Sequence, residues 1–247
     1  LAASNIIMEA SSKPRVAGHK GVTDLVTETD MKSEETIKAI IRSFYSEHSI
    51  LAEETGQDSN ISDYLWIIDP LDGTTNFVHG YPSYAVSIGL FYKKAPLIGV
   101  VLEMPNMKLY TAIKDQGAWC EGEKMNTSNT KNIKRSLLVT GFGYEHGENW
   151  EKNMRLFKCL TDDTQGVRRL GAAAIDICYV AKGYADGFWE YDLKPWDTAA
   201  GILIAREAGC VITDMSGDRF DINDNNILIT NGHIHQDMVN SIERYLN

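Results

Sequence analysis

The feature that most restricts the fold is an apolar run that ends abruptly in acid, 66-WIIDPLDGTTNF-77. The residues from Tyr64 to Asp69 have the apolar and aromatic content of a buried strand. Because a residue before proline is held extended, we expect Asp69 to end this strand and Pro70 to bar further sheet pairing. Gly73 permits a tight turn, and Thr74 and Thr75, which follow it, are suited to begin a helix. The stretch therefore predicts a strand, a turn and a helix start that share two carboxylates.

This junction has the chemistry of a phosphate site that depends on metal ions. The unpaired N–H groups of a helix start bind phosphate. Two neighbouring aspartates repel each other unless something positive lies between them, and the stretch contains no Lys or Arg. Anionic ligands and anionic side chains share a site through metal ions, and oxygen ligands select hard cations such as Mg²⁺ or Mn²⁺. Metal-assisted phosphate chemistry follows.

A surface turn is the competing interpretation, because Asp, Pro and Gly are common turn formers. Acidic residues elsewhere favour the metal site. The pair Glu53 and Glu54 ends the preceding predicted strand, 49–54, and Asp197 stands at the start of an apolar helix predicted over 195–209. Asp197 can cap that helix and bind a metal ion at the same time.

The composition excludes some functions. The 247 residues are 43% hydrophobic and 23% charged, which is ordinary for a globular protein of one or two domains. A formal charge of −10 argues against nucleic acid or an anionic membrane as a partner. The four cysteines stand far apart, as in a protein of a reducing compartment. The chain begins inside a predicted helix without Met, so we expect a cytoplasmic protein, or a plastid protein whose transit peptide has been removed.

Two regions with different patterns of predicted strands and helices follow one another along the chain. Residues 84–125 show β-rich runs separated by turn signals, which predicts an antiparallel meander. From Ser136 onward strands and helices alternate, which predicts a layered arrangement of helices over a sheet. We place an N-terminal α+β region with the main metal site at 1–135 and a C-terminal α/β region that completes the site at 136–247.

The motifs together resemble those of the inositol monophosphatase family, which comprises Mg²⁺-dependent, lithium-sensitive phosphatases. The motif D-P-x-D-G-T at 69–74 is accompanied, in the right order, by 24-DLVTETD-30, 53-EE-54, 171-GAAAIDICYVAKG-183 and 196-WDTAAG-201. Within the family, the chain resembles the plant plastid and cyanobacterial members most, through 141-GFGYEH-146, 167-VRRLGAAA-174 and 194-KPWD-197. The resemblance implies a layered αβαβα sandwich of the inositol monophosphatase/fructose-1,6-bisphosphatase type, of the α/β (α+β) class, and a homodimer.

The resemblance also implies metal ligands and a means of activating water. Two or three Mg²⁺ ions, with Mn²⁺ as a substitute, would be held by Glu53, Asp69, the Leu71 carbonyl, Asp72 and Asp197. Thr74, hydrogen-bonded to Asp30, would act with Glu53 to orient and activate the attacking water.

Substrate contacts are implied on both sides of the metals. The amides of Gly73 and Thr74 would hold the phosphate, beside Asp72 and Asp197. The hydroxyls of the alcohol would meet Ala173 and Glu190. For two arginines, Arg168 and Arg169, we expect salt bridges at a helix or subunit interface. Tyr144 and His146 are candidates for the substrate rim, and Lys20 is left unassigned because the spacing from Lys20 to Asp24 varies in the family.

The resemblance leaves the substrate open among small phosphorylated polyols and amino alcohols. An inositol monophosphate is the leading candidate. Histidinol phosphate is a rival, because Glu190 and Asp192 could receive its ammonium group, and a sugar phosphate or bisphosphate is another. A non-catalytic metal-binding regulatory protein is the alternative from a different class. Retention of Thr74 and Asp30 beside every expected ligand argues against lost catalysis.

Overall fold

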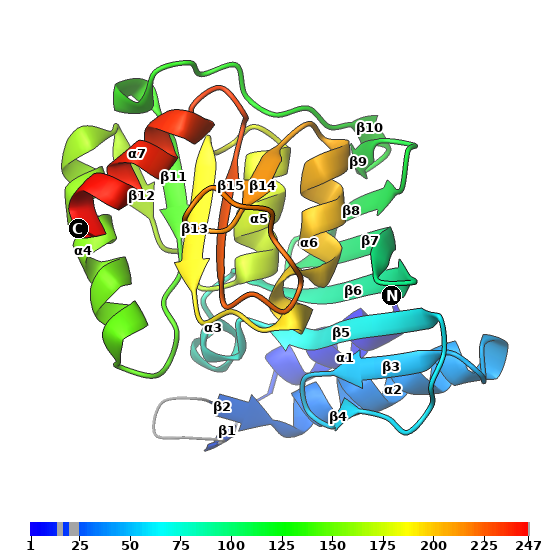
Figure 1. The fold of residues 1–247 in the computed structure, drawn as a ribbon. Coiled ribbons are helices and arrows are strands. Elements are labelled where there is room, and N and C mark those ends of the chain that lie inside the picture. Colours follow the sequence, from blue (N-terminus) through cyan, green and yellow to red (C-terminus); the bar gives the residue numbers. More distant parts are fainter. Residues whose placement is uncertain (14–16, 20–24, 247) are drawn as a thin grey trace.

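The computed structural model describes residues 1–13, 17–19 and 25–246, which form five layers of helix and sheet (Figure 1). Helices α1 and α2 cover one face of a first sheet, and α5 and α6 lie between this sheet and a second one. The outer face of the second sheet is covered by α4 and α7. The predicted αβαβα sandwich is confirmed. The helices are α1 Ala2–Ser11, α2 Glu28–Phe44, α3 Thr74–His79, α4 Glu148–Asp163, α5 Ala173–Ala181, α6 Pro195–Glu207 and α7 His235–Leu246, with a 3-10 turn at Ile133–Arg135.

The first sheet has eight strands in the order β10-β9-β8-β7-β6-β5-β3-β4. Its strands are β3 Ser49–Ala52, β4 Gly56–Gln57, β5 Tyr64–Asp72, β6 Tyr84–Tyr92, β7 Ala95–Met104, β8 Lys108–Ile113, β9 Ala118–Cys120 and β10 Glu123–Lys124. Strands β6 to β10 form the predicted antiparallel meander. The pair β3 and β5 is parallel, so both strands deliver their C-terminal ends to the same edge.

The second sheet has the order β12-β11-β13-β15-β14, and a separate two-stranded sheet pairs β1 with β2. These strands are β1 Ala17–His19, β2 Leu25–Thr27, β11 Leu137–Thr140, β12 Gly166–Arg168, β13 Gly187–Tyr191, β14 Val211–Thr213 and β15 Asn226–Thr230. The predicted alternation of strand and helix after Ser136 is confirmed. The boundary between 1–135 and 136–247 stays a prediction.

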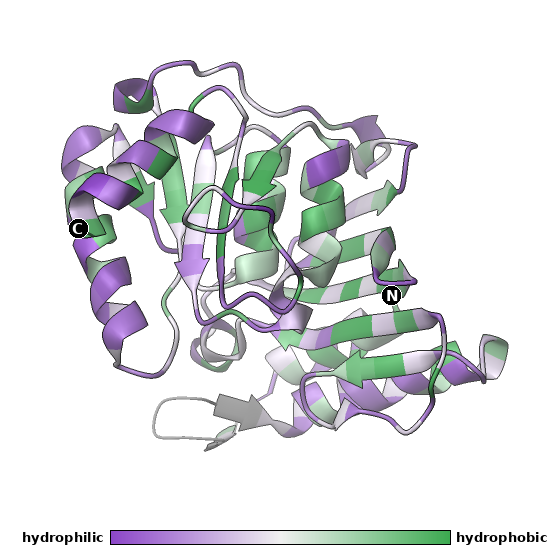
Figure 2. Ribbon diagram, in the orientation of Figure 1, coloured by the Kyte–Doolittle hydropathy of each residue, from purple (hydrophilic) through white to green (hydrophobic). Residues whose placement is uncertain are grey.

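Helix α6 lies unusually close to the first sheet, and this approach positions the site. A Cβ on Gly99 would lie 2.5 Å from the Ala200 carbonyl oxygen, and one on Gly89 would lie 2.9 Å from the Ala199 Cβ. Glycine in two neighbouring strands therefore lets the small residues of α6 pack onto the sheet. Figure 2 shows apolar residues along α5 and the strands beside it, and hydrophilic residues on α4 and α7. The main core fills the space between the sheets.

Strand β5 corrects the expectation that Asp69 ends a strand. Asp69 pairs with Ser87 of β6, the pairing is interrupted, and Asp72 resumes it opposite Ala85. Pro70 falls in this irregularity, where its missing N–H removes no ladder hydrogen bond. The strand therefore continues through the proline to Asp72.

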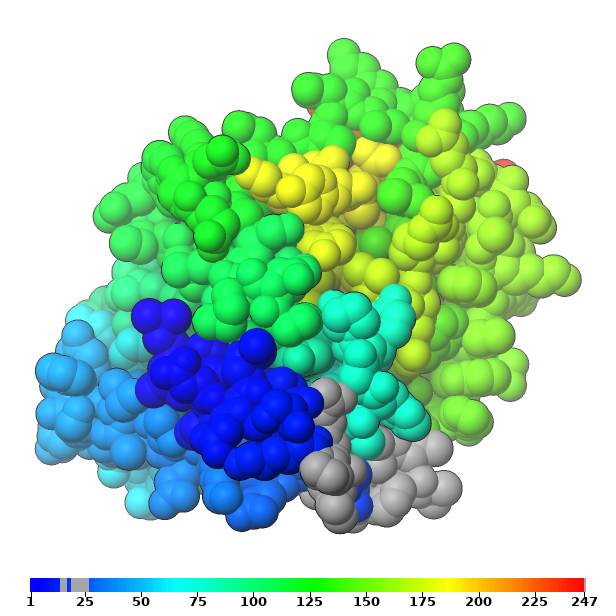
Figure 3. All heavy atoms as spheres, turned by 180° about the vertical axis from the view of Figure 1, so that it is seen from behind, coloured from blue at the N-terminus to red at the C-terminus, as the bar shows by residue number. Residues whose placement is uncertain are grey.

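The described part of the motif at 24–30 divides between a strand and a helix. Strand β2 ends at Thr27, which caps α2 by accepting a hydrogen bond from the Thr29 amide. Asp30 accordingly lies in the first turn of a helix. Figure 3 shows the opposite face of the molecule, where α1 packs against α2. Within the described residues, no helix is both long and apolar enough to cross a membrane.

Candidate active site

One cleft, with a volume of about 340 Å³, opens where the two sheets and the starts of α3, α5 and α6 meet. Every predicted metal ligand lines it, and so does every residue predicted to hold the phosphate or the alcohol: Glu53, Asp69, Leu71, Asp72, Gly73, Thr74, Ala173, Glu190 and Asp197. Asp30, fully buried, contacts the cleft through Thr74. Residues separated by more than a hundred positions thus share one cavity.

The parallel pair β3 and β5 places two of the acids side by side. Ala52 pairs with Ile68, and the Glu53 amide continues the pairing with a 3.2 Å bond to the Ile68 carbonyl. Glu53 therefore leaves β3 next to the point where Asp69 follows Ile68 in β5. Parallel strand ends that meet at one edge are a common location for ligand sites in layered α/β proteins.

Gly73 makes the turn between β5 and α3 possible. Its φ of 84° lies in the left-handed region, and a Cβ there would lie 3.0 Å from the Ser83 carbonyl oxygen and 3.1 Å from that of Gly171. Both constraints require glycine. The predicted helix start at Thr74 is confirmed.

Thr74 and Asp30 form a buried hydroxyl–carboxylate pair. Thr74 Oγ1 lies 2.8 Å from Asp30 Oδ1 and 3.1 Å from the Leu71 carbonyl oxygen. The other oxygen of Asp30 accepts hydrogen bonds from the amide and the hydroxyl of Thr27. Burial raises the pKa of Asp30, and the hydrogen bonds from Thr27 and Thr74 oppose that rise. The pair is held firmly on the Asp30 side, which leaves the lone pairs of the hydroxyl for a group in the cleft.

The carboxylates of the cleft raise one another's pKa. Burial raises the pKa of Asp69 well above its ordinary value, and the negative charges of Glu53, Asp72 and Asp197 raise it further. The pKa of Asp72 rises to about 7, chiefly through burial, although Asp72 Oδ2 accepts a 2.8 Å hydrogen bond from the Ala174 amide. Such a cluster is costly unless positive charge compensates it.

Asp197 combines the two roles expected of it. It is the third residue of α6, and its Oδ2 accepts a 2.6 Å hydrogen bond from the Lys194 amide, which closes the N-terminus of the helix. Burial raises the pKa of Asp197, and the charges of Asp72 and Glu53 add to the rise against that hydrogen bond. Its carboxylate therefore belongs to the same electrostatic cluster.

The donor set fits a hard divalent cation. Carboxylates and the Leu71 carbonyl supply only oxygen, which Mg²⁺ prefers. Among the described residues, however, no three His, Cys, Asp or Glu side chains already converge as a complete ligand set. The acids line a shared wall, and a bound ion would have to draw them together.

The opposite wall carries Glu190, at the end of β13. Its side chain is buried, and burial together with the charge of Asp176 raises its pKa well above the ordinary value, while Arg169 opposes the rise. A Cβ on Gly141 would lie 2.3 Å from either Glu190 carboxylate oxygen, so only glycine leaves space for this acid. Gly141 thus determines where Glu190 can lie.

Several cleft residues were not predicted. Arg169 lines the cleft, with its guanidinium 6.0 Å from the Phe142 ring centroid, whereas Arg168 donates to the Val167 carbonyl. In the described part of the chain neither arginine forms an ion pair, so the expected helix-interface salt bridge is wrong. An interface between subunits stays a prediction for both.

The expected substrate rim is divided by the structure. Tyr144 lines the cleft, whereas His146 stacks on Trp150 at a centroid distance of 4.5 Å and does not line it. Trp196, Lys194 and Asp192 also line the cleft. Asp192 was expected here only as a partner of an ammonium group. Lys194 and Trp196 belong to the motif 194-KPWD-197 but had no predicted role, because they follow β13 in a segment with the pattern of a loop and a helix start. Lys20 and Asp24 lie outside the described residues.

Comparison with known proteins gives a consistent result. A sequence profile described as Inositol monophosphatase family matches residues 1–246. The chain is 49% identical to "Phosphatase IMPL1, chloroplastic" of Arabidopsis thaliana, over 97% of this chain and 66% of that protein. It is 44% identical to "Inositol-1-monophosphatase" of Synechocystis sp., over 96% and 84%. It is 39% identical to "Nus factor SuhB" of Pseudomonas aeruginosa, over 92% and 86%.

Solved structures agree with these relatives. An inositol monophosphatase from Anabaena sp. PCC 7120 superposes with a TM-score of 0.87 at 37% identity, over 99% of this chain and 92% of that one. An IMPase/NADP phosphatase complexed with Mg²⁺ and phosphate superposes with a TM-score of 0.84 at 27% identity, over 97% and 90%.

Proposed function

The chain belongs to the inositol monophosphatase family, whose members are Mg²⁺-dependent phosphatases of phosphate monoesters, and from this premise we propose that it hydrolyses an inositol monophosphate. One observation carries the proposal. The cleft joins an all-oxygen acidic wall to the Thr74–Asp30 pair, with Glu190 across from both. Because the chain spans 66% of the Arabidopsis relative, the activity of the whole protein is part of this proposal.

The acidic wall would hold the cations. Glu53, Asp69, the Leu71 carbonyl, Asp72 and Asp197 would bind two or three Mg²⁺ ions, for which Mn²⁺ could substitute. When bound, these ions supply a lowered pKa for water, neutralisation of the phosphate oxygens and stabilisation of the leaving alkoxide. The fit rests on the mutual rise in pKa of the carboxylates, which a cation would reverse.

The chain's own groups would orient the reactants and move the proton. Thr74 Oγ1 would accept a hydrogen bond from the attacking water while it donates to Asp30 Oδ1, and Glu53 would lie on the other side of that water. The amides of Gly73 and Thr74, which line the cleft at the start of α3, would hold the phosphate. Positioned proton-transfer groups contribute roughly 10²–10⁴-fold to rate.

The alcohol would lie against the wall formed by Ala173 and Glu190. Glu190 would accept hydrogen bonds from hydroxyls of the substrate, which favours a polyol. Histidinol phosphate is the second candidate, because Asp192 also lines the cleft and could join Glu190 around an ammonium group. Asp192 is already hydrogen-bonded to Asn149 Nδ2 at 2.7 Å, which makes this the weaker fit.

A non-catalytic role is the remaining rival, and relatives named Nus factor make it worth testing. The decisive experiment measures phosphate release from an inositol monophosphate, histidinol phosphate, a sugar bisphosphate and a glycerol phosphate. We expect turnover that is greatest for the inositol phosphate, abolished by chelation, restored by Mg²⁺ or Mn²⁺, and inhibited by millimolar Li⁺. No release from any substrate with Mg²⁺ present would contradict the enzyme, and release that survives chelation would contradict the metal.

Assembly and location complete the proposal. We propose a homodimer, which sedimentation equilibrium would test through the mass of the particle relative to the 27.6 kDa chain. The relative named chloroplastic supports a plastid location, with the cytoplasm as the alternative. Microscopy of the full-length gene product fused to a fluorescent protein would separate the two.

A further inference from the structure

Helix α2 presents three buried polar side chains to the active site, and only one of them has a role so far. Asp30, Ser33 and Glu34 are 0%, 0% and 2% exposed. Their spacing of three and four residues puts them on one face of the helix. We name these three residues the α2 polar face. Buried polar groups are costly unless they are hydrogen-bonded, so the partners of each matter.

Each member of the α2 polar face bonds to a different segment of the catalytic wall. Asp30 accepts from Thr74 at the start of α3. Ser33 Oγ donates a 2.9 Å hydrogen bond to the Pro70 carbonyl, inside the irregularity of β5 between Asp69 and Asp72. Glu34 reaches the third segment, the turn that begins with Glu53 and links β3 to β4.

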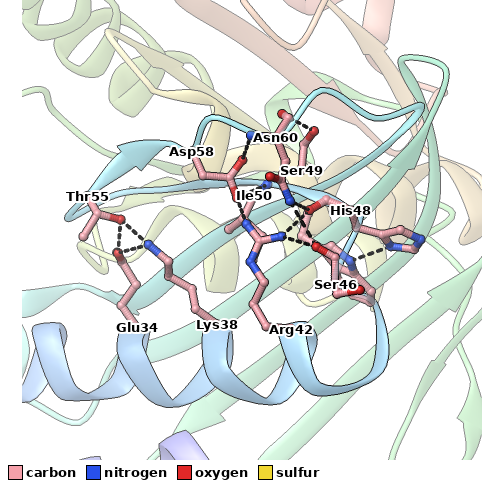
Figure 4. Close-up of polar contacts among 11 residues, drawn as sticks. Glu34, Lys38, Arg42, Ser46, His48, Ser49, Ile50, Thr55, Asp58 and Asn60 are labelled. Carbon is pink, nitrogen blue, oxygen red and sulfur yellow. Dashed lines mark hydrogen bonds and ion pairs between the residues drawn. The ribbon is translucent and has the colours of Figure 1, made fainter.

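Figure 4 shows the contacts of Glu34 and Lys38 with Thr55 in this turn. Glu34 Oε2 accepts a 2.8 Å hydrogen bond from the Glu54 amide, and Glu34 Oε1 accepts a 2.5 Å bond from Thr55 Oγ1. Lys38, one helical turn further, donates to Thr55 Oγ1 at 2.6 Å and lies 3.6 Å from Glu34 Oε1. Two donors, the Glu54 amide and the Thr55 hydroxyl, thus converge on one buried side chain.

The turn is attached to both of its neighbours, β5 and α2. Glu53 is attached to β5 by its amide bond to the Ile68 carbonyl. Beyond Glu53 the chain reverses through Gly56, at a φ of 70°, into a strand of only two residues. The backbone of Glu53 is therefore fixed by β5 on one side and by Glu34, through the next residue, on the other.

We propose that Glu34 is a positioning residue that fixes the Glu53 carboxylate where it can bind Mg²⁺. The inference rests on the proposed function, since it assumes that Glu53 is a metal ligand. Ser33 supports the neighbouring segment in the same way, so one helix face sets the relative positions of Glu53, Asp69 and Thr74. Groups that orient metal ligands typically change metal affinity by ~10–100-fold when removed.

The test measures Mg²⁺ binding by calorimetry, without substrate. Glu34→Ala leaves the Glu54 amide and the Thr55 hydroxyl without their acceptor, and we expect Mg²⁺ affinity to fall about 10-fold, or ~1.4 kcal/mol. Glu34→Gln should retain most of the affinity, because its amide can accept from Glu54 and donate to Thr55 Oγ1. Glu35→Ala is the matched control, since Glu35 is exposed on the same helix.

Hydrogen exchange at the Glu54 amide supplies a second measurement. It should accelerate in Glu34→Ala and remain slow in Glu34→Gln and Glu35→Ala. If Glu34→Ala lowers the melting temperature without metal but binds Mg²⁺ as tightly as the parent, Glu34 is merely structural and the inference is overturned.

A further variant covers the case in which Glu34→Ala fails to fold. Thr55→Val, at an exposed site, removes one of the two donors to Glu34 and should weaken Mg²⁺ binding about two- to threefold. Unchanged affinity in Thr55→Val would then overturn the inference. A parent protein that binds no Mg²⁺ would instead show that the proposed function itself has failed.

Discussion

Two fully buried aspartates flank the cleft from opposite helices, and they differ in how they are bonded. Asp30, on α2, accepts hydrogen bonds from the amide and hydroxyl of Thr27 and from Thr74. Asp176, on α5, has two carboxylate oxygens that find no hydrogen-bond partner among the described residues. The same residue type at the same depth is thus satisfied on one side of the cleft and unsatisfied on the other.

The consequence lies in their protonation. Burial raises the pKa of both, but hydrogen bonds oppose the rise at Asp30. At Asp176 the charge of Asp72 adds to burial in raising the pKa, and the attraction of Arg169 opposes the rise. Hydrogen bonds to the charged form keep Asp30 able to accept from Thr74, whereas Asp176 favours its neutral form. Under the proposed function, the N-terminal side of the cleft would therefore serve proton transfer, and the C-terminal side would serve packing and recognition.

The sharpest way to break this comparison is Asp30→Asn. The variant removes the anionic acceptor of Thr74, so kcat at saturating Mg²⁺ should fall by roughly 10²–10⁴-fold. Asparagine has one acceptor oxygen where Asp30 has two, so it cannot accept from both Thr27 and Thr74, and the free energy of unfolding should fall by about 1 kcal/mol. Steady-state kinetics and urea unfolding measure the two effects. A kcat close to that of the parent would show that the Asp30–Thr74 bond is structural.

Thr74→Val tests the other partner of that bond. Valine keeps the branched shape but lacks the hydroxyl, so turnover should fall roughly 10²-fold while Mg²⁺ binding persists. Calorimetric Mg²⁺ titration beside steady-state rates separates the two quantities. Excess Mg²⁺ should not restore the rate, and a variant that it rescues would place Thr74 with the metal ligands.

Asp69→Asn is expected to show the opposite behaviour. It removes one negative charge from the acidic wall without changing its shape, so Mg²⁺ affinity should fall about 10-fold or more. High Mg²⁺ should restore part of the rate. Affinity equal to that of the parent would mean that Asp69 does not contact the ions.

On the C-terminal side, Glu190→Gln should act on specificity. The kcat/KM for an inositol phosphate should fall several-fold more than that for a glycerol phosphate, because the smaller alcohol lacks most of the hydroxyls that Glu190 would orient. Both substrates are compared on one preparation of the variant. Equal losses would assign Glu190 to the fold or to the metals.

Asp176→Asn should have the smallest effect on turnover, within about twofold of the parent, because asparagine resembles the neutral acid. Its effect on stability should depend on pH. The folded-state pKa of Asp176 is raised, so its stabilising contribution is full below the unfolded value of 3.8 and is lost as pH rises through the folded pKa. In urea unfolding without metal ions, the free energy of unfolding of the variant should rise relative to that of the parent between about pH 5 and pH 8.

The exposed Asp162→Asn serves as the control for that measurement. The difference in the free energy of unfolding between Asp162→Asn and the parent should stay constant over the same range of pH. A parallel response of the two variants would mean that Asp176 is ionised in the folded protein, and the contrast with Asp30 would disappear.

Much of the fold was accessible from the sequence, because its signals are local. The β-rich run after Tyr84, the alternation after Ser136 and the helix start at Thr74 follow from periodicity and turn residues over a few positions. Strand β5 is longer than predicted, and the reason is a contact with a neighbouring strand. Proline usually stops a strand, and here an irregularity opposite β6 absorbs Pro70 and lets Asp72 pair again.

The proximity of Asp69, Asp72, Gly73 and Thr74 follows from the sequence. Covalent spacing keeps these residues close, and glycine can adopt the left-handed φ that the turn requires. The partnership of Thr74 with Asp30 was expected only through family resemblance. Three features depend on the tertiary structure. They are the hydrogen bond from the Glu54 amide to Glu34, the position of Arg169 in the cleft and the unsatisfied carboxylate of Asp176. Such contacts join segments tens of residues apart, and local propensity carries no information about which distant group will satisfy a buried charge.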